Sequence, residues 1–297
     1  MQSVTMQNAL TIDLEDWYQG LTSTGRQPEQ WPIYEARVVA NTERLLAIFA
    51  AAGVQATFFV LGYVADHFPA LVRHVADQGH EIALHGYSHQ HVGRLTPAQF
   101  RDDVERGWEA VQAASNARPR GFRAPMFSIN GDSLWALEVL RELGFDYDSS
   151  VFPTRNPLYG YPQAPRFPYH PFAGDPFVEF PLAVTRVMGL NWPVAGGFYL
   201  RLLPYPLLKW GLQRLNQERI PAVIYLHPWD LDTDQPRLNP TLRERFTHYH
   251  NRQSSEQKLL ALLRDFRFAP LQELLTQSDS TGSFLPAENK ERPCWSV

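Results

Sequence analysis

The sequence of 297 residues predicts an α/β fold in which helices cover parallel strands. Short apolar runs alternate with longer segments whose apolar residues recur at helical spacing. Polar clusters follow several of the apolar runs, at the point where each strand would end. A hydrophobic content of 44% is enough for a large core, in one barrel-sized domain or in two small ones.

The strand candidates are short apolar runs, many of them rich in β-branched and aromatic residues. They lie at 8–14, 55–62, 81–85, 121–125, 145–150, within 178–187 and at the start of 222–230. Most of them are separated by a helical segment, and this alternation is typical of parallel strands joined by covering helices.

The helix candidates show apolar residues on one face, and several carry end signals. Their ranges are 36–53, 68–79, 96–115, 129–144, 207–221 and 254–268. Gly53 and Gly79 end the first two, whereas Thr96 followed by Pro97 is typical of a helix start. Residues 152–206, rich in proline and aromatic residues, are expected to form long loops that shape a rim, because an insertion of that size is usually functional.

Charge and composition exclude several classes of protein. The net charge of −4 and the pI near 6.2 provide no basic surface for phosphates, so nucleic acid is not expected as a partner. A single cysteine excludes an intramolecular disulfide framework. The sequence contains no apolar run of membrane-spanning length and does not begin like a signal peptide, so a cytoplasmic location is expected.

Carboxylates and imidazoles follow two of the predicted strands. Asp13, Glu15 and Asp16 come at the end of the first strand, where one carboxylate could bind a cation and another could act as a base. His85 ends a later strand, and a short turn could bring His89 to the same ion. Two imidazoles and one carboxylate suit Zn²⁺ or another divalent transition metal. The alternative is that these are solvated acids and unrelated histidines.

Three further polar residues follow other strands, and in a parallel α/β barrel all these strand ends converge on one face. A buried Arg123 could hold a carboxylate ionised and aimed; a surface salt bridge is the alternative. His227 follows an apolar strand, and a histidine that does not bind the metal could be a general acid. Asp148 could orient His227, or it could be only a turn residue.

Five motifs carry a resemblance when they are taken in order. They are "TIDLED", "HGYSH", "FRAPMF", "DYDSS" and "YLHPW". This set resembles the motifs of the polysaccharide deacetylases, carbohydrate esterase family 4 or the NodB-homology domain, over roughly residues 8–230. Segments at 195–205, 225–238 and 245–268 resemble, more narrowly, the deacetylases encoded in exosortase-linked exopolysaccharide loci, whose C-terminal extension has no known function.

The resemblance implies a distorted (β/α) barrel, often with seven strands, and metal-dependent removal of acetyl groups from N-acetylated saccharides. Zn²⁺ is the expected cation, with Co²⁺ or another transition metal as alternatives. Carried across, the roles are Asp13 as base, His85 and His89 as ligands, Arg123 positioning Asp13, and His227 as acid tuned by Asp148. Leu226 would line the acetyl pocket, and Pro125 and Trp229 are further candidates for substrate contact.

The third metal ligand departs from the family pattern of two adjacent aspartates. Leu14 follows Asp13 here, so either Glu15 or Asp16 is the remaining ligand. The period of two along a strand places Glu15 on the same face as Asp13, which favours Glu15. A β-bulge would be needed to bring in Asp16.

The expected organisation is a catalytic barrel at 1–230, an extension at 231–276 packed on it, and a disordered tail at 277–297. Its expected partner is an N-acetylated saccharide, met inside the cell as a sugar nucleotide, a lipid-linked oligosaccharide or a nascent polymer. The sequence leaves the oligomeric state open. Other functions considered are hydrolysis of a cyclic or other small amide, inactive sugar binding, and non-haem iron oxygenation, whose ligands normally lie on a β-sandwich.

Overall fold

The fold is organised around one sheet of eight strands. The computed structural model describes residues 6–281, apart from 22, 26, 157–158 and 239–240. Each neighbouring pair of strands in this sheet is parallel, as predicted. The strands are β1 (Gln7–Leu14), β2 (Thr57–Val60), β3 (Glu81–Leu84), β4 (Gly121–Phe122), β5 (Tyr147–Asp148), β6 (Val178–Glu179), β9 (Val223–Leu226) and β10 (Arg267–Ala269).

Seven of these strands curl into an incompletely closed barrel. The order runs from β9 through β1, β2, β3, β4 and β5 to β6, because β9 and β2 pair with opposite edges of β1. Just beyond β6, the amide of Ala183 donates to the carbonyl of Val223 in β9 at 3.1 Å, which links the two ends of the row. The predicted distorted barrel with seven strands is therefore confirmed.

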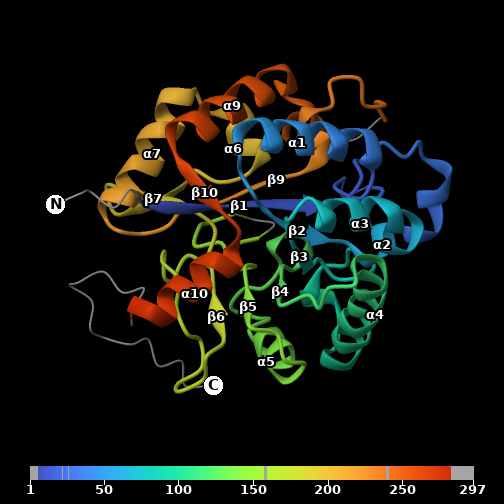
Figure 1. The fold of residues 1–297 in the computed structure, drawn as a ribbon, viewed down its shortest axis with the longest axis horizontal. Coiled ribbons are helices and arrows are strands. Elements are labelled where there is room, and N and C mark those ends of the chain that lie inside the picture. The colour runs from blue at the N-terminus through green and yellow to red at the C-terminus, as the bar shows by residue number, and fades with distance from the viewer. Residues whose placement is uncertain (1–5, 22, 26, 157–158, 239–240, 282–297) are drawn as a thin grey trace.

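Helices surround the curled strands: in the view of Figure 1, α1, α6, α7 and α9 lie above β1, and α4, α5 and α10 lie below it. Their bounds are α1 (Val38–Ala52), α2 (Gly62–His67), α3 (Pro69–Asp77), α4 (Pro97–Ser115), α5 (Trp135–Glu142), α6 (Gly197–Leu202), α7 (Tyr205–Gln217), α8 (Leu242–Tyr249), α9 (Ser255–Asp265) and α10 (Leu271–Thr281). The predicted end signals hold: Gly53 follows α1 with φ +63°, and Thr96 forms a capping box with Gln99 at the start of α4.

The insertion at 152–206 contains more regular structure than expected. Strands β7 (Val184–Val187) and β8 (Leu190–Pro193) form an antiparallel hairpin, and α6 follows it. Met188 and Gly189 both have positive φ at its turn, a geometry that fits the twist of the two flanking strands. The strand expected within 178–187 is present as β6 and β7, whereas the loops expected around it missed β8 and α6, which have only four and six residues.

The C-terminal part of the described chain adds to the sheet. The predicted helix at 254–268 was too long: α9 ends at Asp265, and β10 pairs with the start of β1 because Phe268 and Ala269 are buried there. Helix α9 packs against α1, α6 and α7. The boundary at residue 230 stays a prediction. Of the predicted tail, α10 reaches Thr281, and 282–297 lie outside the described residues.

Across the described residues, none of the helices combines the length and the apolar composition that crossing a bilayer requires.

Candidate active site

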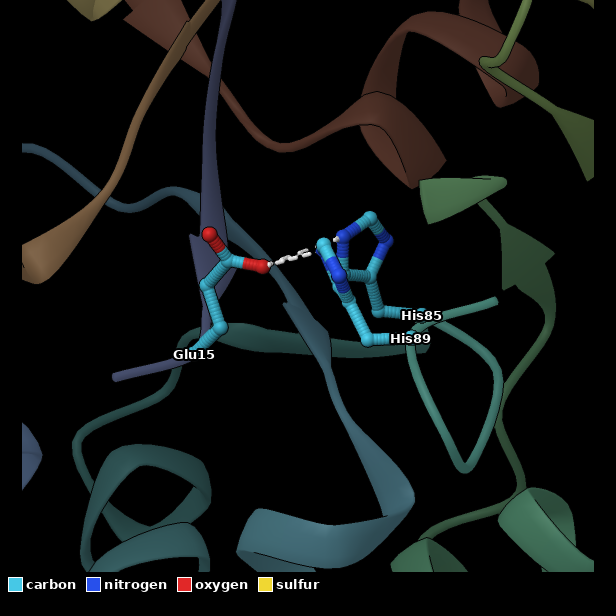
Figure 2. A group of neighbouring side chains, drawn as sticks. All are labelled: Glu15, His85 and His89. Atoms are coloured by element: carbon cyan, nitrogen blue, oxygen red, sulfur yellow. Dashed lines mark ion pairs between the residues drawn. The ribbon is translucent and has the colours of Figure 1, made fainter. Parts of the chain in front are cut away.

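Glu15, His85 and His89 come together where β1 and β3 end. Oε2 of Glu15 lies 2.6 Å from Nε2 of His89 and 3.8 Å from Nε2 of His85. One ligand atom from each of the three residues lies within 4.8 Å of the others. Figure 2 shows the carboxylate pointing toward both rings. All three side chains are buried, so their arrangement is determined by the surrounding fold.

The chemistry of this donor set fits a divalent transition metal. Nδ1 of His85 is 2.8 Å from the carbonyl oxygen of Arg123 and must donate to it, so Nε2 carries the lone pair that faces Glu15. Burial lowers the pKa of His85 to about 3, which keeps this ring neutral. Burial opposes ionisation of Glu15, but His89, His227 and His85 lower its pKa to about 2. A carboxylate and two imidazoles with room for further ligands are typical of Zn²⁺ and related ions.

The structure places the carboxylate of Glu15, and not that of Asp16, beside His85 and His89. Asp13 and Glu15 both face Nε2 of His227, as the strand period predicts, although Glu15 lies just beyond β1 and its amide donates to the carbonyl of Asp13 at 3.0 Å. The Asp16 carboxylate instead accepts hydrogen bonds from the backbone amides of Trp17, Arg37 and Val38, at 2.8, 2.8 and 3.1 Å. Because the oxygens of Asp16 serve the start of α1, the geometry favours Glu15 over Asp16 as the third ligand.

The turn that brings His89 back is held by helix α4. The carboxylate of Asp103 accepts hydrogen bonds from the amides of Tyr87 and Ser88, at 2.9 and 3.2 Å, and from the Ser88 hydroxyl. Gly86 has φ +69°, and a Cβ there would come within 2.9 Å of the Asp103 carboxylate. His89 itself has φ +52°, a left-handed conformation that the surrounding contacts must stabilise. Glycine and an acidic anchor thus allow the tight return.

Asp13 is paired with Arg123 inside the barrel. Nη1 of Arg123 donates to Oδ1 of Asp13 at 2.8 Å and to the hydroxyl of Thr11 at 2.7 Å. The same guanidinium donates to the carbonyl and the hydroxyl of Ser149, both at 2.9 Å. Burial raises the pKa of Asp13, while Arg123 and His227 oppose this shift. Arg123 is thus a buried residue that aims Asp13, and the surface salt bridge considered for it is excluded.

His227 lies between the two carboxylates that follow β1. Its Nε2 is 3.8 Å from Oδ2 of Asp13 and 3.8 Å from Oε1 of Glu15. Burial lowers the pKa of His227 to about 4, and the carboxylates of Glu15 and Asp13 act in the opposite direction.

The predicted partner of His227, Asp148, must be corrected. Asp148 accepts hydrogen bonds from the amide and the hydroxyl of Ser150, at 2.9 and 2.6 Å, and interacts with the buried Glu179. Nδ1 of His227 is instead 3.0 Å from Oδ2 of Asp230. Sequence reasoning missed Asp230, although its spacing in "HPWD" is that of a short helical turn after a strand. The expectation for Asp148 came from the family resemblance, which assigns the tuning of the acid to this residue.

The three predicted substrate contacts differ in their placement. Leu226 and Pro125 are buried beside the site residues, and their contact with substrate stays a prediction. Trp229 is only 5% exposed; its ring stacks on His227, and Nε1 donates to Oε1 of Glu15 at 3.2 Å. This placement makes Trp229 a support for His227 and Glu15 rather than an open surface for a sugar.

Two family models match adjacent parts of the chain. Residues 30–147 match the polysaccharide deacetylase family, and residues 149–276 match a domain of unknown function, DUF3473. His85, His89 and Arg123 lie in the first segment, and His227 lies in the second. Asp13 and Glu15 precede both. The candidate site is therefore assembled from all three parts of the chain.

Known proteins are similar to parts of this chain. Over 121 residues it is 35% identical to a peptidoglycan deacetylase-like protein of Gibberella zeae, covering 40% of this chain and 34% of that protein. Over 108 residues it is 31% identical to a peptidoglycan deacetylase of Helicobacter pylori, covering 36% of each. The chain thus spans about a third of the length of these curated relatives.

The solved structure of a protein from Mycobacterium smegmatis has a similar fold over nearly the whole chain. Its TM-score is 0.60 at 21% sequence identity, and the match covers 98% of this chain and 97% of that one.

Proposed function

We propose that this chain is a metal-dependent hydrolase that removes N-acetyl groups from amino sugars, a proposal supported by the match of residues 30–147 to the polysaccharide deacetylase family. The observation that carries this proposal is the position of Nε2 of His227, 3.8 Å from both Asp13 and Glu15. An acid, a base and a metal-ligating carboxylate thus converge on one point, as hydrolysis of an amide requires.

The roles of the residues follow from their contacts. Arg123 occupies Oδ1 of Asp13, which leaves Oδ2, the oxygen nearer His227, to accept a proton from the attacking water. A raised pKa suits Asp13 for this role, since a base works best near the operating pH. His227 would act in its imidazolium form, with Nδ1–H held by the Asp230 carboxylate, and would give the proton on Nε2 to the departing amine. A divalent cation held by Glu15, His85 and His89 would polarise the amide carbonyl and lower the pKa of the water.

The proposed substrate is an N-acetylated amino sugar in an exopolysaccharide or its precursor. The resemblance of the C-terminal part to exosortase-linked deacetylases supports this choice. Of the two relatives named above, one is described as a peptidoglycan deacetylase and the other as a peptidoglycan deacetylase-like protein, so both names point to N-acetylated saccharides. Zn²⁺ is the proposed cation. The cytoplasmic location stays a prediction.

The test is acetate release from N-acetylglucosamine oligomers, with bound metal quantified in wild type, Asp13→Asn and His89→Ala. We expect Asp13→Asn to keep the metal and lose activity, and His89→Ala to lose both. Metal binding through His89 without acetate release from any N-acetylated sugar would reject the substrate class and favour a cyclic or other small amide.

A further inference from the structure

We infer that Asp230 and Arg201, both in the segment of unknown function, are positioning residues that fix the ring of His227 for the proposed reaction. This inference rests on the proposed function for its catalytic meaning, but its structural content concerns only contacts within the described chain. It would assign part of the segment matched by DUF3473 a direct task in the active site.

The first observation is that Asp230 holds His227 through two hydrogen bonds. Oδ2 of Asp230 accepts the backbone amide of His227 at 2.9 Å and faces Nδ1 of the same residue at 3.0 Å. Because a carboxylate can only accept, Nδ1 must carry a proton and Nε2 is left to face Asp13 and Glu15. Asp230 therefore determines both the orientation of the ring and its tautomer.

The second observation is that Arg201 forms an ion pair with Asp230. The guanidinium of Arg201 forms an ion pair with Oδ1 of Asp230, the oxygen that His227 does not use. Nη2 of Arg201 donates to the carbonyl of Thr247 at 2.6 Å, which ties the arginine to α8. Asp230 is fully buried and Arg201 is 1% exposed, so the charge of Asp230 is balanced by protein rather than by water.

The third observation is that the backbone at Gly197 packs closely against the Asp230 carboxylate. Gly197 begins α6 directly against Asp230, and a Cβ at this position would overlap both carboxylate oxygens. The segment "AGG" thus lets the chain that carries Arg201 approach the carboxylate closely. Asp230 is held from three directions, by His227, Arg201 and the backbone at Gly197.

A purely stabilising role is a poor explanation of this arrangement. A buried ion pair is weak evidence for stability, since apolar residues of similar volume are often as good or better. Here Asp230, one member of the pair, also accepts a hydrogen bond from Nδ1 of His227, the ring nitrogen that points away from the candidate metal ligands. The arrangement serves the orientation of a reactive ring, as an aspartate does for histidine in other hydrolases.

The closing experiment compares wild type, Asp230→Asn and the double variant Arg201→Met/Asp230→Asn. In Asp230→Asn the charge of Arg201 should attract the amide oxygen, so the amide NH₂ turns toward Nδ1 and forces the proton of His227 to Nε2. In the double variant the amide oxygen is released and can return to Nδ1–H. Nitrogen-15 NMR of the histidine rings in metal-free protein reports the tautomer, and a His227→Gln spectrum assigns the signal.

Kinetics provide the second readout. We expect Asp230→Asn to lower kcat about 10²-fold or more, which is the usual contribution of a positioned acid, with KM changed by no more than a few-fold. The double variant should recover part of kcat. Asp232→Asn is the matched control: Asp232 is buried two residues away and pairs with Arg37, so this variant should lose stability but keep the tautomer and kcat.

The inference is overturned if Asp230→Asn keeps the Nδ1–H tautomer with kcat within about twofold of wild type, or if the double variant behaves like the single one. If wild type releases no acetate, the proposed function fails by itself. The tautomers of the three proteins then still decide whether Arg201 acts on His227 through Asp230.

Discussion

The imidazole of His227 stacks on the indole of Trp229, with ring centroids 4.2 Å apart and an angle of 13° between the planes. The same indole donates to Oε1 of Glu15 at 3.2 Å. One buried side chain thus connects the proposed acid with the carboxylate of the candidate metal site, although 214 positions separate Trp229 from Glu15 in the sequence.

Trp229→Phe should keep the stacking and remove the hydrogen bond. Because outer donors orient metal-ligating groups, the affinity for Zn²⁺ should fall by about 10-fold. Competition with a chromophoric chelator measures this change. Trp210→Phe, on the exposed face of α7, is the control and should leave the affinity unchanged. An unaltered affinity in Trp229→Phe would mean that the indole does not orient Glu15.

Glu15→Gln and Asp16→Asn should separate the two adjacent acids. We expect Glu15→Gln to lose most of the bound metal, since the amide is a poor ligand beside two imidazoles. Asp16→Asn should keep the metal and lower the free energy of unfolding by about 1–3 kcal/mol, because an amide replaces a carboxylate that accepts hydrogen bonds from three backbone amides. Metal content after dialysis and urea unfolding test both; retention of metal by Glu15→Gln would contradict the ligand assignment.

Asp103→Ala should loosen the turn that carries His89. It removes the acceptor of the Tyr87 and Ser88 amides, so we expect metal affinity to fall by about 10-fold or more. Asp102→Ala, on the exposed side of the same helix, is the matched control. Equal affinities of the two variants, measured by isothermal titration, would show that the turn holds its shape without Asp103.

His80 should make stability sensitive to acid, far from the proposed chemistry. Burial lowers its pKa from 6.5 to about 4, and Nδ1 accepts the amide of Ala56 at 3.1 Å. Between pH 6.5 and 4 the unfolded chain therefore binds more protons than the folded one, and the free energy of unfolding falls as pH decreases through this range.

We expect the contribution of His80 to be on the order of 1–3 kcal/mol. Urea unfolding of wild type and His80→Asn at several pH values isolates it, because the asparagine keeps an acceptor but does not titrate there. The difference between the two proteins should change with pH only within this window. Parallel stability curves would contradict the assignment.

Much of the fold followed from local patterns. The apolar runs at β1, β2, β3 and β9 are long or regular enough to identify as strands. Strands β4 and β5 were predicted too long: each has two residues, although the Arg123 amide just after β4 still donates to the carbonyl of Leu84 in β3 at 2.9 Å. Strand β10 was missed because three residues carry too little pattern by themselves, and they pair only once β1 is present.

The sequence by itself determined the order of the elements and the cluster of polar residues at the strand ends, and it favoured Glu15 over Asp16. Strand period and helix end signals act within a few residues, so they can be read locally. Only the tertiary structure decided which group holds His227. The direction of the Asp230 carboxylate depends on the short turn after β9, and its charge is balanced by Arg201 from a helix beyond the β7–β8 hairpin. Closure of the barrel brings such distant groups together, and no local sequence pattern predicts which of several buried acids will contact the ring of His227.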